Sequence, residues 1–382
     1  MTLSGLEKMR FICAAATLAG TIIGVGIFGI PFVVAQAGFA TGVFDLVAIA
    51  FLSLFMHLAY AEAVLRTGQD HRLIGYIGKY FGSKSKKVAT AVLLVEYYGI
   101  ILAYIIVGGE FLNLIFSSWL PSSEFIWSII FFLFAAWAIF LGPRALAKNE
   151  LFFTGLLILA AIYLSAKGIV SLNPSNLTGF DWAKFFVPYG VIFFSFGGST
   201  AIPEIRQILK GREKKTKSAI ILGTLIPLII YLLFALAVVG VSGSKTSPEA
   251  IKGLVPFLGE GTIILGAVFG ILAIFTSFLT AGMNLKKIFQ YDYRVKSFPS
   301  FILALGLPIA AYLLGFKNFI VLIAFTGAVL GGIDGIFTIL VYLRAKKLGD
   351  RRPEFSLPKG KFLAYLTIAL FVFGIIYQIA MI

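Results

Sequence analysis

The stretch AGTIIGVGIFGIPF, residues 19–32, interrupts what would otherwise be an ordinary membrane helix. It lies within a long apolar run, yet it contains Gly20, Gly24, Gly26, Gly29 and Pro31. Glycine and proline are the residues that weaken a helix most. A helix broken in lipid leaves amide and carbonyl groups without partners, at roughly several kcal/mol each, and is tolerated only where something else binds them. The stretch therefore predicts a broken membrane helix with a binding role.

The composition of the whole chain is that of a membrane protein. Of the 382 residues, 59% are hydrophobic and only 13% are charged, whereas soluble domains have about 25% charged residues. A spanning helix needs roughly 20 apolar residues. Eleven segments meet this requirement, at about 9–36, 41–66, 88–116, 125–142, 150–170, 185–206, 217–241, 261–286, 298–315, 318–345 and 361–382. We expect an all-α polytopic membrane protein with one transmembrane domain over residues 1–382.

The basic residues predict how the chain is oriented in the membrane. If the N-terminus is cytoplasmic, 27 of the 32 Lys and Arg residues lie on the cytoplasmic side, as the positive-inside rule requires. The C-terminus is then outside, and the compact chain fits a cell membrane. The net charge of +15 reflects this topology, and because no groove-reading motif accompanies it, nucleic acid is not an expected partner. Glu62 and Arg66, four residues apart, are expected to form an ion pair at the membrane interface.

A second broken helix is predicted at VIFFSFGGSTAIPEI, residues 191–205. It resembles the first, since each has a glycine pair followed five residues later by the proline of an Ile-Pro dipeptide. The two stretches lie five spans apart, so the second half must enter the membrane from the opposite side. This predicts an inverted repeat of five plus five helices, with repeat one at about 9–170, repeat two at about 185–345, and an extra helix at about 361–382. Paired glycine- and proline-interrupted spans are a pointer to a transporter binding site.

The backbone groups freed at such breaks have opposite preferences. Amides at the start of a half-helix favour an anion such as a carboxylate, and carbonyls at the end of a half-helix favour an ammonium group or another cation. Two broken helices together suit a zwitterion, of which an α-amino acid is the commonest small example. The alternative is that the glycines serve helix packing, and Gly20-xxx-Gly24 fits a close-packing motif.

At these residues the chain resembles the amino acid–polyamine–organocation transporter superfamily. That superfamily has the five-plus-five inverted-repeat fold first seen in sodium-coupled leucine transport. The likeness is closest to the amino acid/auxin permease and aromatic amino acid permease branches. It is carried by GTIIGVGIFGIP (20–31), SFGGSTAIPEI (195–205) and AYIIVGGE (103–110), with support from AIFTSFL (273–279). The motifs are specific for the fold and not for the substrate.

The resemblance implies a role for each position at the breaks. The backbone of the first break would receive the substrate carboxylate, carbonyls of the second would receive the ammonium group, a tyrosine would close over the site, and side chains of the second break would line the pocket. The implied substrate-binding residues are Thr21, Ile22, Gly24, Val25, Gly26, Tyr104, Ile192, Phe193, Ser195, Phe196, Gly197 and Ser199. Neither break, taken as residues 19–32 and 191–203, contains a charged side chain, which favours a neutral amino acid.

The resemblance also implies a sodium site, made by a hydroxyl pair and helix carbonyls. The matching residues are Gly20, Ile23, Ala273, Thr276 and Ser277. The alternative is that the two hydroxyls bond back to their own helix. Some proton-coupled relatives place a lysine of the fifth helix near this site, but this segment has lysines only at its ends, Lys148 and Lys167. Sodium is therefore slightly favoured, and no other cofactor is expected.

Two acidic residues are candidates for proton coupling. Glu96 and Asp334 lie within expected spans, where ionisable groups are rare and usually functional. The alternative is a buried pair or a satisfied hydrogen bond. His57 is more simply explained as a packing or hydrogen-bonding residue.

We expect a secondary active transporter that moves a neutral L-amino acid by alternating access, as an ion-coupled symporter. A proton-coupled symporter or exchanger is the alternative, and a passive channel or an amino acid sensor is less favoured. An enzyme is not expected, because the chain has only two histidines and neither an HExxH motif nor a nucleophile elbow. The remaining expected partner is the lipid bilayer, with the protein a monomer or a weak homo-oligomer.

Overall fold

The computed structural model describes residues 3–117, 119–120, 122–141, 150–291, 293–358 and 361–381, and this part of the chain is helical, without strands. The expected all-α fold class is confirmed. The α-helices are α1 (Leu3–Ile22), α2 (Gly26–Ala37), α3 (Phe39–Leu65), α4 (Leu73–Phe116), α5 (Glu124–Leu141), α6 (Glu150–Val170), α7 (Tyr189–Ser195), α8 (Ile202–Ile208), α9 (Thr216–Ser242), α10 (Val255–Leu258), α11 (Glu260–Tyr291), α12 (Ser297–Leu313), α13 (Phe319–Phe325), α14 (Gly332–Leu348) and α15 (Phe362–Ala380).

Each of the eleven expected segments falls on helix. Within the described residues, seven helices are long and apolar enough to cross a membrane, and the bent pair of α1 and α2 makes an eighth candidate. The helices α6 and α12 are apolar but shorter, and α7 and α8 have only seven residues each. Residues 142 and 382, which end two expected spans, and Lys148 lie outside the described residues.

Two segments differ from expectation. The helix α4 begins at Leu73 rather than near residue 88, because the basic stretch before the span is also helical and is joined to it across a kink at Gly82, where φ is +83°. The tenth expected span is not one uniform helix. It consists of α13, a π-helical segment at Thr326–Gly331 and α14, and π-helical turns are frequent at functional sites.

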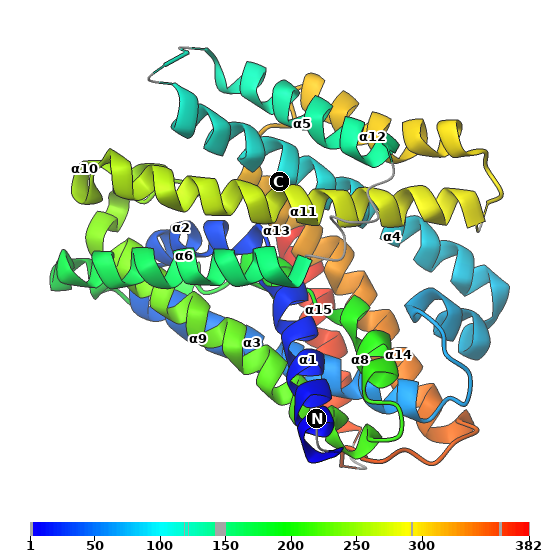
Figure 1. The fold of residues 1–382 in the computed structure, drawn as a ribbon. Helices are drawn as coiled ribbons and strands as arrows, with labels where there is room; N and C mark the ends of the chain where they lie inside the picture. The colour runs from blue at the N-terminus through cyan, green and yellow to red at the C-terminus, as the bar shows by residue number, and fades with distance from the viewer. Residues whose placement is uncertain are drawn as a thin grey trace.

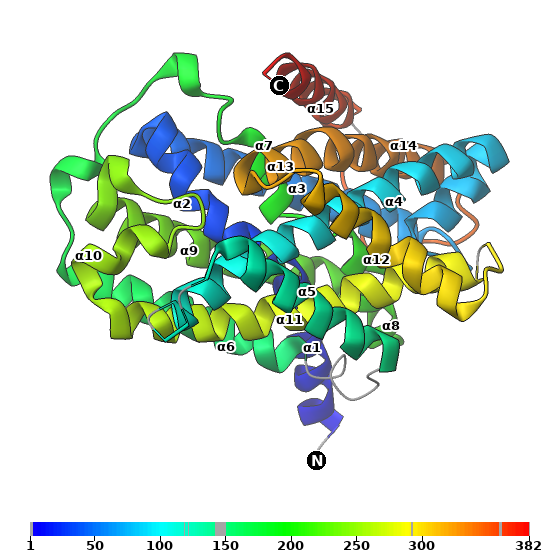
Figure 2. The same ribbon diagram turned by 90° about the horizontal axis from the view of Figure 1, so that it is seen from above.

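The broken helices lie at the centre of the bundle. The helix α1 packs against α9, α8 and α6, whereas α2 packs against α9, α7 and α3. The helices α5 and α12 lie side by side on another part of the bundle (Figure 1). The helix α15 lies at the edge, against α14 and the π-helical segment (Figure 2). The glycine-rich elements therefore have helices on several sides, as backbone that is not continuously helical requires in a membrane.

The C-terminal end of α3 is held by an arginine of α8. The last carbonyl groups of a helix have no partner within it. Arg206 donates to the carbonyl oxygen of Val64, in the last turn of α3, at 2.7 Å and to that of Thr67, just beyond the helix, at 2.8 Å. Arg206 also pairs with Asp70 at 3.1 Å. A cation at this position is favoured by the negative end of the helix dipole. The second half of the second broken helix is thereby anchored to α3.

The segment after α14 covers the same end of α3. Arg351 donates to the Leu65 oxygen at 2.7 Å, and the buried Glu62 accepts from the Leu357 amide at 2.6 Å. The expected pair of Glu62 and Arg66 is confirmed, at 2.8 Å. At the exposed edge of this region, the hydrogen bond from Lys79 lowers the pKa of the Asp350 carboxyl group.

We predict that Arg206→Gln lowers the free energy of unfolding by about 1–3 kcal/mol, because charged hydrogen bonds to the end of α3 are lost. The measurement is the melting temperature of the purified protein in detergent. The control is Arg352→Gln, which removes an exposed arginine and should leave the melting temperature unchanged. Equal melting temperatures for the two variants would show that Arg206 does not anchor α8.

Candidate functional site

The first break separates α1, which ends at Ile22, from α2, which begins at Gly26, and the two are bent by 58°. No backbone carbonyl of the described residues accepts from the amides of Gly24, Val25 or Gly26. The N-cap residue of α2, Val25, makes no side-chain capping bond. The positive end of a twelve-residue helix therefore meets the break without a side-chain capping bond from its N-cap residue.

The second break separates α7, which ends at Ser195, from a short 3₁₀ turn at Ser199–Ala201 and then α8. The Gly197 amide donates to the Phe194 oxygen at 3.1 Å, and the Ala201 amide to the Gly198 oxygen at 3.1 Å. These local bonds satisfy part of the backbone, so the break is a structured turn. The carbonyl group of Ser195 does not accept a backbone amide from within the described residues.

The structure brings the two breaks into contact. A Cβ atom on Gly26 would lie 2.9 Å from the Ser195 Cα, closer than two carbon atoms can approach. Glycine at position 26 thus lets the start of α2 touch the end of α7. The Tyr231 hydroxyl of α9 joins the same place, 2.8 Å from the Ile22 carbonyl oxygen and 2.9 Å from the Ser195 carbonyl oxygen.

Two aromatic residues from the predicted set also lie at the breaks. The hydroxyl of Tyr104, in α4, is 3.9 Å from the position of a Cβ on Gly24, so the tyrosine predicted to close over the site does lie beside the first break. The fully buried Phe196 makes an edge-to-face contact with Tyr231, with ring centroids 5.3 Å apart.

The other predicted substrate residues differ in their exposure and in their hydrogen bonds. Thr21 is exposed, and its hydroxyl donates to the Thr17 oxygen of its own helix at 2.8 Å. Gly197 is exposed and Ser199 is half-buried. The carbonyl groups of Ile192 and Phe193 both accept from the Phe196 amide, at 3.1 and 3.2 Å. Each of these two carbonyls therefore retains only one lone pair for a ligand.

The predicted sodium residues are carried by two helices that are not main packing partners. Gly20 and Ile23 belong to α1 and the first break, whereas Ala273, Thr276 and Ser277 belong to α11. The helix α11 packs chiefly against α4, α6, α12 and α5. The Thr276 hydroxyl donates to the Ala273 oxygen at 2.9 Å, which is the back-bonding alternative. The assignment of these five residues to sodium stays a prediction.

Glu96 and Asp334 lie on helices that do pack together, α4 and α14. The two side chains are half-buried. Asp334 is in the first turn of α14, directly after the π-helical segment. That segment also approaches α4 closely, because a Cβ on Gly99 would lie 2.5 Å from the Thr326 hydroxyl oxygen.

The sequence did not predict the positions of two residues, Tyr231 and His57, beside the breaks. Tyr231 gave no signal, because a lone tyrosine in an apolar helix is ordinary. His57 is fully buried, and neither ring nitrogen has a partner among the described residues. Its Cε1 lies 3.1 Å from the position of a Cβ on Gly198, so His57 packs directly against the second break.

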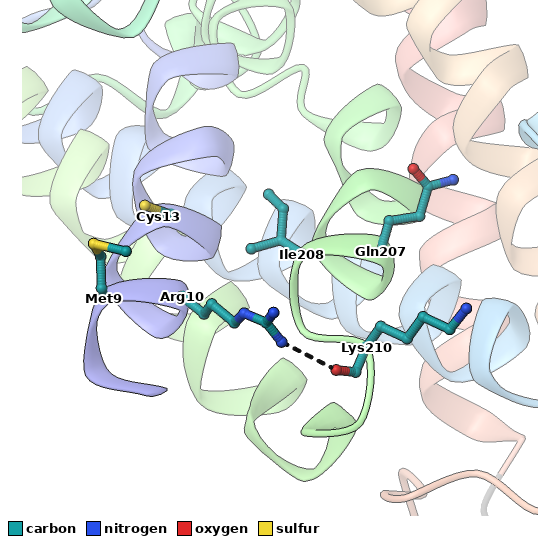
Figure 3. Close-up of a pocket in the computed structure, with 6 residues that line it drawn as sticks. All are labelled: Met9, Arg10, Cys13, Gln207, Ile208 and Lys210. Carbon is teal, nitrogen blue, oxygen red and sulfur yellow. Dashed lines mark hydrogen bonds between the residues drawn. The ribbon is translucent and has the colours of Figure 1, made fainter. Parts of the chain in front are cut away.

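A cavity of about 550 Å³ opens between α1 and the end of α8. Figure 3 shows that α1 and the end of α8 face each other across it, and that the Arg10 guanidinium reaches the Lys210 carbonyl oxygen at 3.5 Å. Arg212 and Glu7 form an ion pair nearby. The lining residues are Met9, Arg10, Cys13, Gln207, Ile208 and Lys210. The first half of one broken helix and the second half of the other thus border an accessible space.

The arrangement of the described helices matches a fold that has been solved before. The structure superposes on the crystal structure of MhsT in complex with L-phenylalanine, with a TM-score of 0.66 over 97% of this chain and 98% of that one, at 16% sequence identity. The likeness establishes the leucine-transporter fold with its two broken helices.

The sequence profile of the tryptophan/tyrosine permease family matches residues 7–379, and the chain belongs to this family. It is 29% identical to tyrosine-specific transport system 1 of Haemophilus influenzae, over 74% of this chain and 73% of that protein. It is 28% identical to glutamine transporter 2 of Aliivibrio fischeri, over 83% and 84%. It is 24% identical to the low affinity tryptophan permease of Proteus vulgaris, over 97% and 95%. These relatives are transporters and permeases, so the chain is not an enzyme.

We predict that Gly26→Ala lowers transport at least tenfold, because the added methyl group cannot fit against Ser195 and must separate the breaks. The measurement is the initial rate of uptake into proteoliposomes. The control, Gly155→Ala in α6, places a methyl group where no atom lies within 4 Å and should transport normally. Normal transport by Gly26→Ala would show that close contact between the breaks is unnecessary.

Proposed function

We propose that the chain is a secondary active transporter that moves a neutral L-amino acid across the membrane by alternating access, as an ion-coupled symporter. The observation that carries this proposal is the meeting of the two breaks at Gly26 and Ser195. At this place the positive end of α2 lies beside the negative ends of α1 and α7. Such an arrangement can hold a carboxylate and an ammonium group without any charged side chain.

The neutral substrate is supported by chemistry and by relatives. The break sequences 19–32 and 191–203 contain no Asp, Glu, Lys or Arg, so a charged substrate side chain would lack a counter-charge there. The named relatives transport tyrosine, tryptophan or glutamine, and all three are neutral amino acids. The substrate would bind with its backbone groups at the breaks, near Tyr104, and its side chain against Phe196 and Ser199.

Sodium is our first choice of coupling ion, with Gly20, Ile23, Ala273, Thr276 and Ser277 as ligands. Hydroxyl and carbonyl oxygens are hard neutral ligands that suit such a cation. A proton is the alternative, and it is supported by the placement of Glu96 and Asp334 on α4 and α14, which pack against each other, since acidic residues within membrane spans are rare and usually functional. An exchanger would use the same site without net ion movement. A passive channel or a sensor has less support.

We predict that proteoliposomes accumulate a neutral amino acid when given an inward sodium gradient, and that Thr276→Ala lowers this uptake at least tenfold. Asp334→Asn should then leave uptake largely intact. Thr367→Ala is the matched control for Thr276→Ala, because the buried Thr367 also donates to a carbonyl of its own helix, at 2.8 Å. The panel includes tyrosine, tryptophan, glutamine, glutamate and lysine.

Three results would contradict parts of this proposal. Uptake driven by a proton gradient and lost in Asp334→Asn would replace sodium with a proton. Preferred uptake of glutamate or lysine would overturn the neutral substrate. If uptake were equally fast with and without an ion gradient, and the amino acid did not accumulate in the proteoliposomes, a passive channel would be favoured.

The orientation and assembly are also proposals. The positive-inside pattern supports a cytoplasmic N-terminus, an outside C-terminus and a place in the cell membrane, and we propose a monomer or a weak homo-oligomer. The cavity beside α1 would then open to the cytoplasm.

We predict that a membrane-impermeant maleimide labels Cys13 in inside-out vesicles and not in intact cells. Cys13 is exposed and is the single cysteine of the chain, so no other cysteine of the chain needs to be replaced. Cys13→Ser is the control for labelling specificity. Labelling of intact cells and not of inside-out vesicles would reverse the proposed orientation.

A further inference from the structure

Tyr231 lies near the middle of α9, is fully buried, and contacts both breaks through one hydroxyl group. Its two neighbours are the carbonyl of the last residue of α1 and the carbonyl of the last residue of α7. We propose that Tyr231 is a positioning residue that holds the two half-helix ends together and leaves one of their carbonyls for the ammonium group of the substrate. This inference rests on the proposed function.

The Tyr231 hydroxyl has fewer hydrogens to donate than it has acceptors beside it. A tyrosine hydroxyl has one hydrogen to donate, yet two carbonyl oxygens lie 2.8 and 2.9 Å from it. Neither carbonyl accepts a backbone amide of the described residues across its break. At any moment one of the two oxygens therefore faces the hydroxyl oxygen without a proton between them. Among the described residues, this pair of carbonyl oxygens thus has one more acceptor than Tyr231 has protons to donate.

The electrostatics point in the same direction. Each helix C-terminus carries about half a negative charge, and here two of them converge on a hydroxyl that carries no net charge. No basic side chain occurs in either break sequence. A group that brings both positive charge and additional N–H donors would stabilise the pair. An α-ammonium group, with three donors, is of this kind.

The surroundings keep the hydroxyl in place. The Tyr231 ring contacts the fully buried Phe196 edge to face at 5.3 Å. The approach of Gly26 to Ser195, which a Cβ would prevent, keeps the α7 carbonyl beside the start of α2. With the ring and the backbone both packed, the hydroxyl cannot follow one carbonyl and release the other. A ligand can therefore meet a preformed pair of acceptors, which lowers the cost of ordering.

The test compares amino acids with carboxylic acids in which hydrogen replaces the ammonium group. Dissociation constants are measured on the purified full chain for L-tyrosine, L-tryptophan and L-glutamine and for their three deamino analogues. The quantity of interest is the affinity ratio, defined as the dissociation constant of the deamino acid divided by that of its amino acid. In the unmodified protein we expect this ratio to exceed about ten, as for a charged hydrogen bond.

Tyr231→Phe removes the hydroxyl and keeps the ring. We expect it to lower the affinity ratio about tenfold, because the carbonyl pair is no longer held for the ammonium group. Gly26→Ala acts on the same pair by displacing Ser195 and should also lower the ratio, so the outcome does not depend on one variant folding. The control is Tyr189→Phe, because Tyr189 is buried and its hydroxyl has no partner among the described residues.

An unchanged affinity ratio in Tyr231→Phe and in Gly26→Ala would overturn the inference. The inference would also be overturned if the variants weakened the binding of both ligands equally, because a purely structural role predicts that result. If the unmodified protein binds amino acids with a ratio near one, the inference fails while the proposed transport function stands. If it binds no amino acid at all, the proposed substrate class fails, and the inference fails with it.

Discussion

In a bilayer, each amide and carbonyl group of the backbone needs a partner from the protein, from trapped water or from a ligand. A continuous helix meets this need internally, and a broken one does not. The two breaks here meet the need partly by local turns and partly through Tyr231, whose hydroxyl serves the ends of α1 and α7. Among the described residues, the amides of residues 24–26 and the carbonyl groups of Ile22 and Ser195 have no backbone partner, and these groups are complementary to the carboxylate and ammonium groups of an amino acid.

The scaffold around the breaks combines close contact with firm anchors. Gly26 allows backbone to touch backbone at the centre, whereas the outer end of α8 is tied to α3 by Arg206. The outer end of α8 is thus fixed, and the half-helices meet at the centre through the Gly26 contact and the hydrogen bonds of Tyr231. The proposed alternating access would require these half-helices to move relative to one another. The cavity between α1 and α8 borders the outer parts of both broken helices.

The two candidate coupling sites use different parts of the molecule. The sodium residues would require α1 and α11 to meet, although α11 packs mainly elsewhere in this structure. The acidic pair requires only α4 and α14, which already pack together beside the π-helical segment. Sodium coupling would therefore follow the movement of α1, and proton coupling would follow the charge state of Glu96 and Asp334. The two cases differ in which helix contact changes during the cycle.

Much of this protein could be read from the residues alone. Hydropathy placed all eleven helical segments, because a lipid bilayer requires helices of a certain length and apolarity. The matched glycine and proline clusters located both breaks, because few other residues can end a helix within a membrane. The kink at Gly82, the π-helical segment and the roles of Tyr231 and His57 could not be found in this way. These features depend on which helices pack against each other. A tyrosine or histidine in an apolar span gives the same sequence pattern whether it packs against a side chain or against an unpaired carbonyl group of a neighbouring helix. The sequence therefore located the unsatisfied backbone, and the packing of α9 and α3 against it determined which side chains meet it.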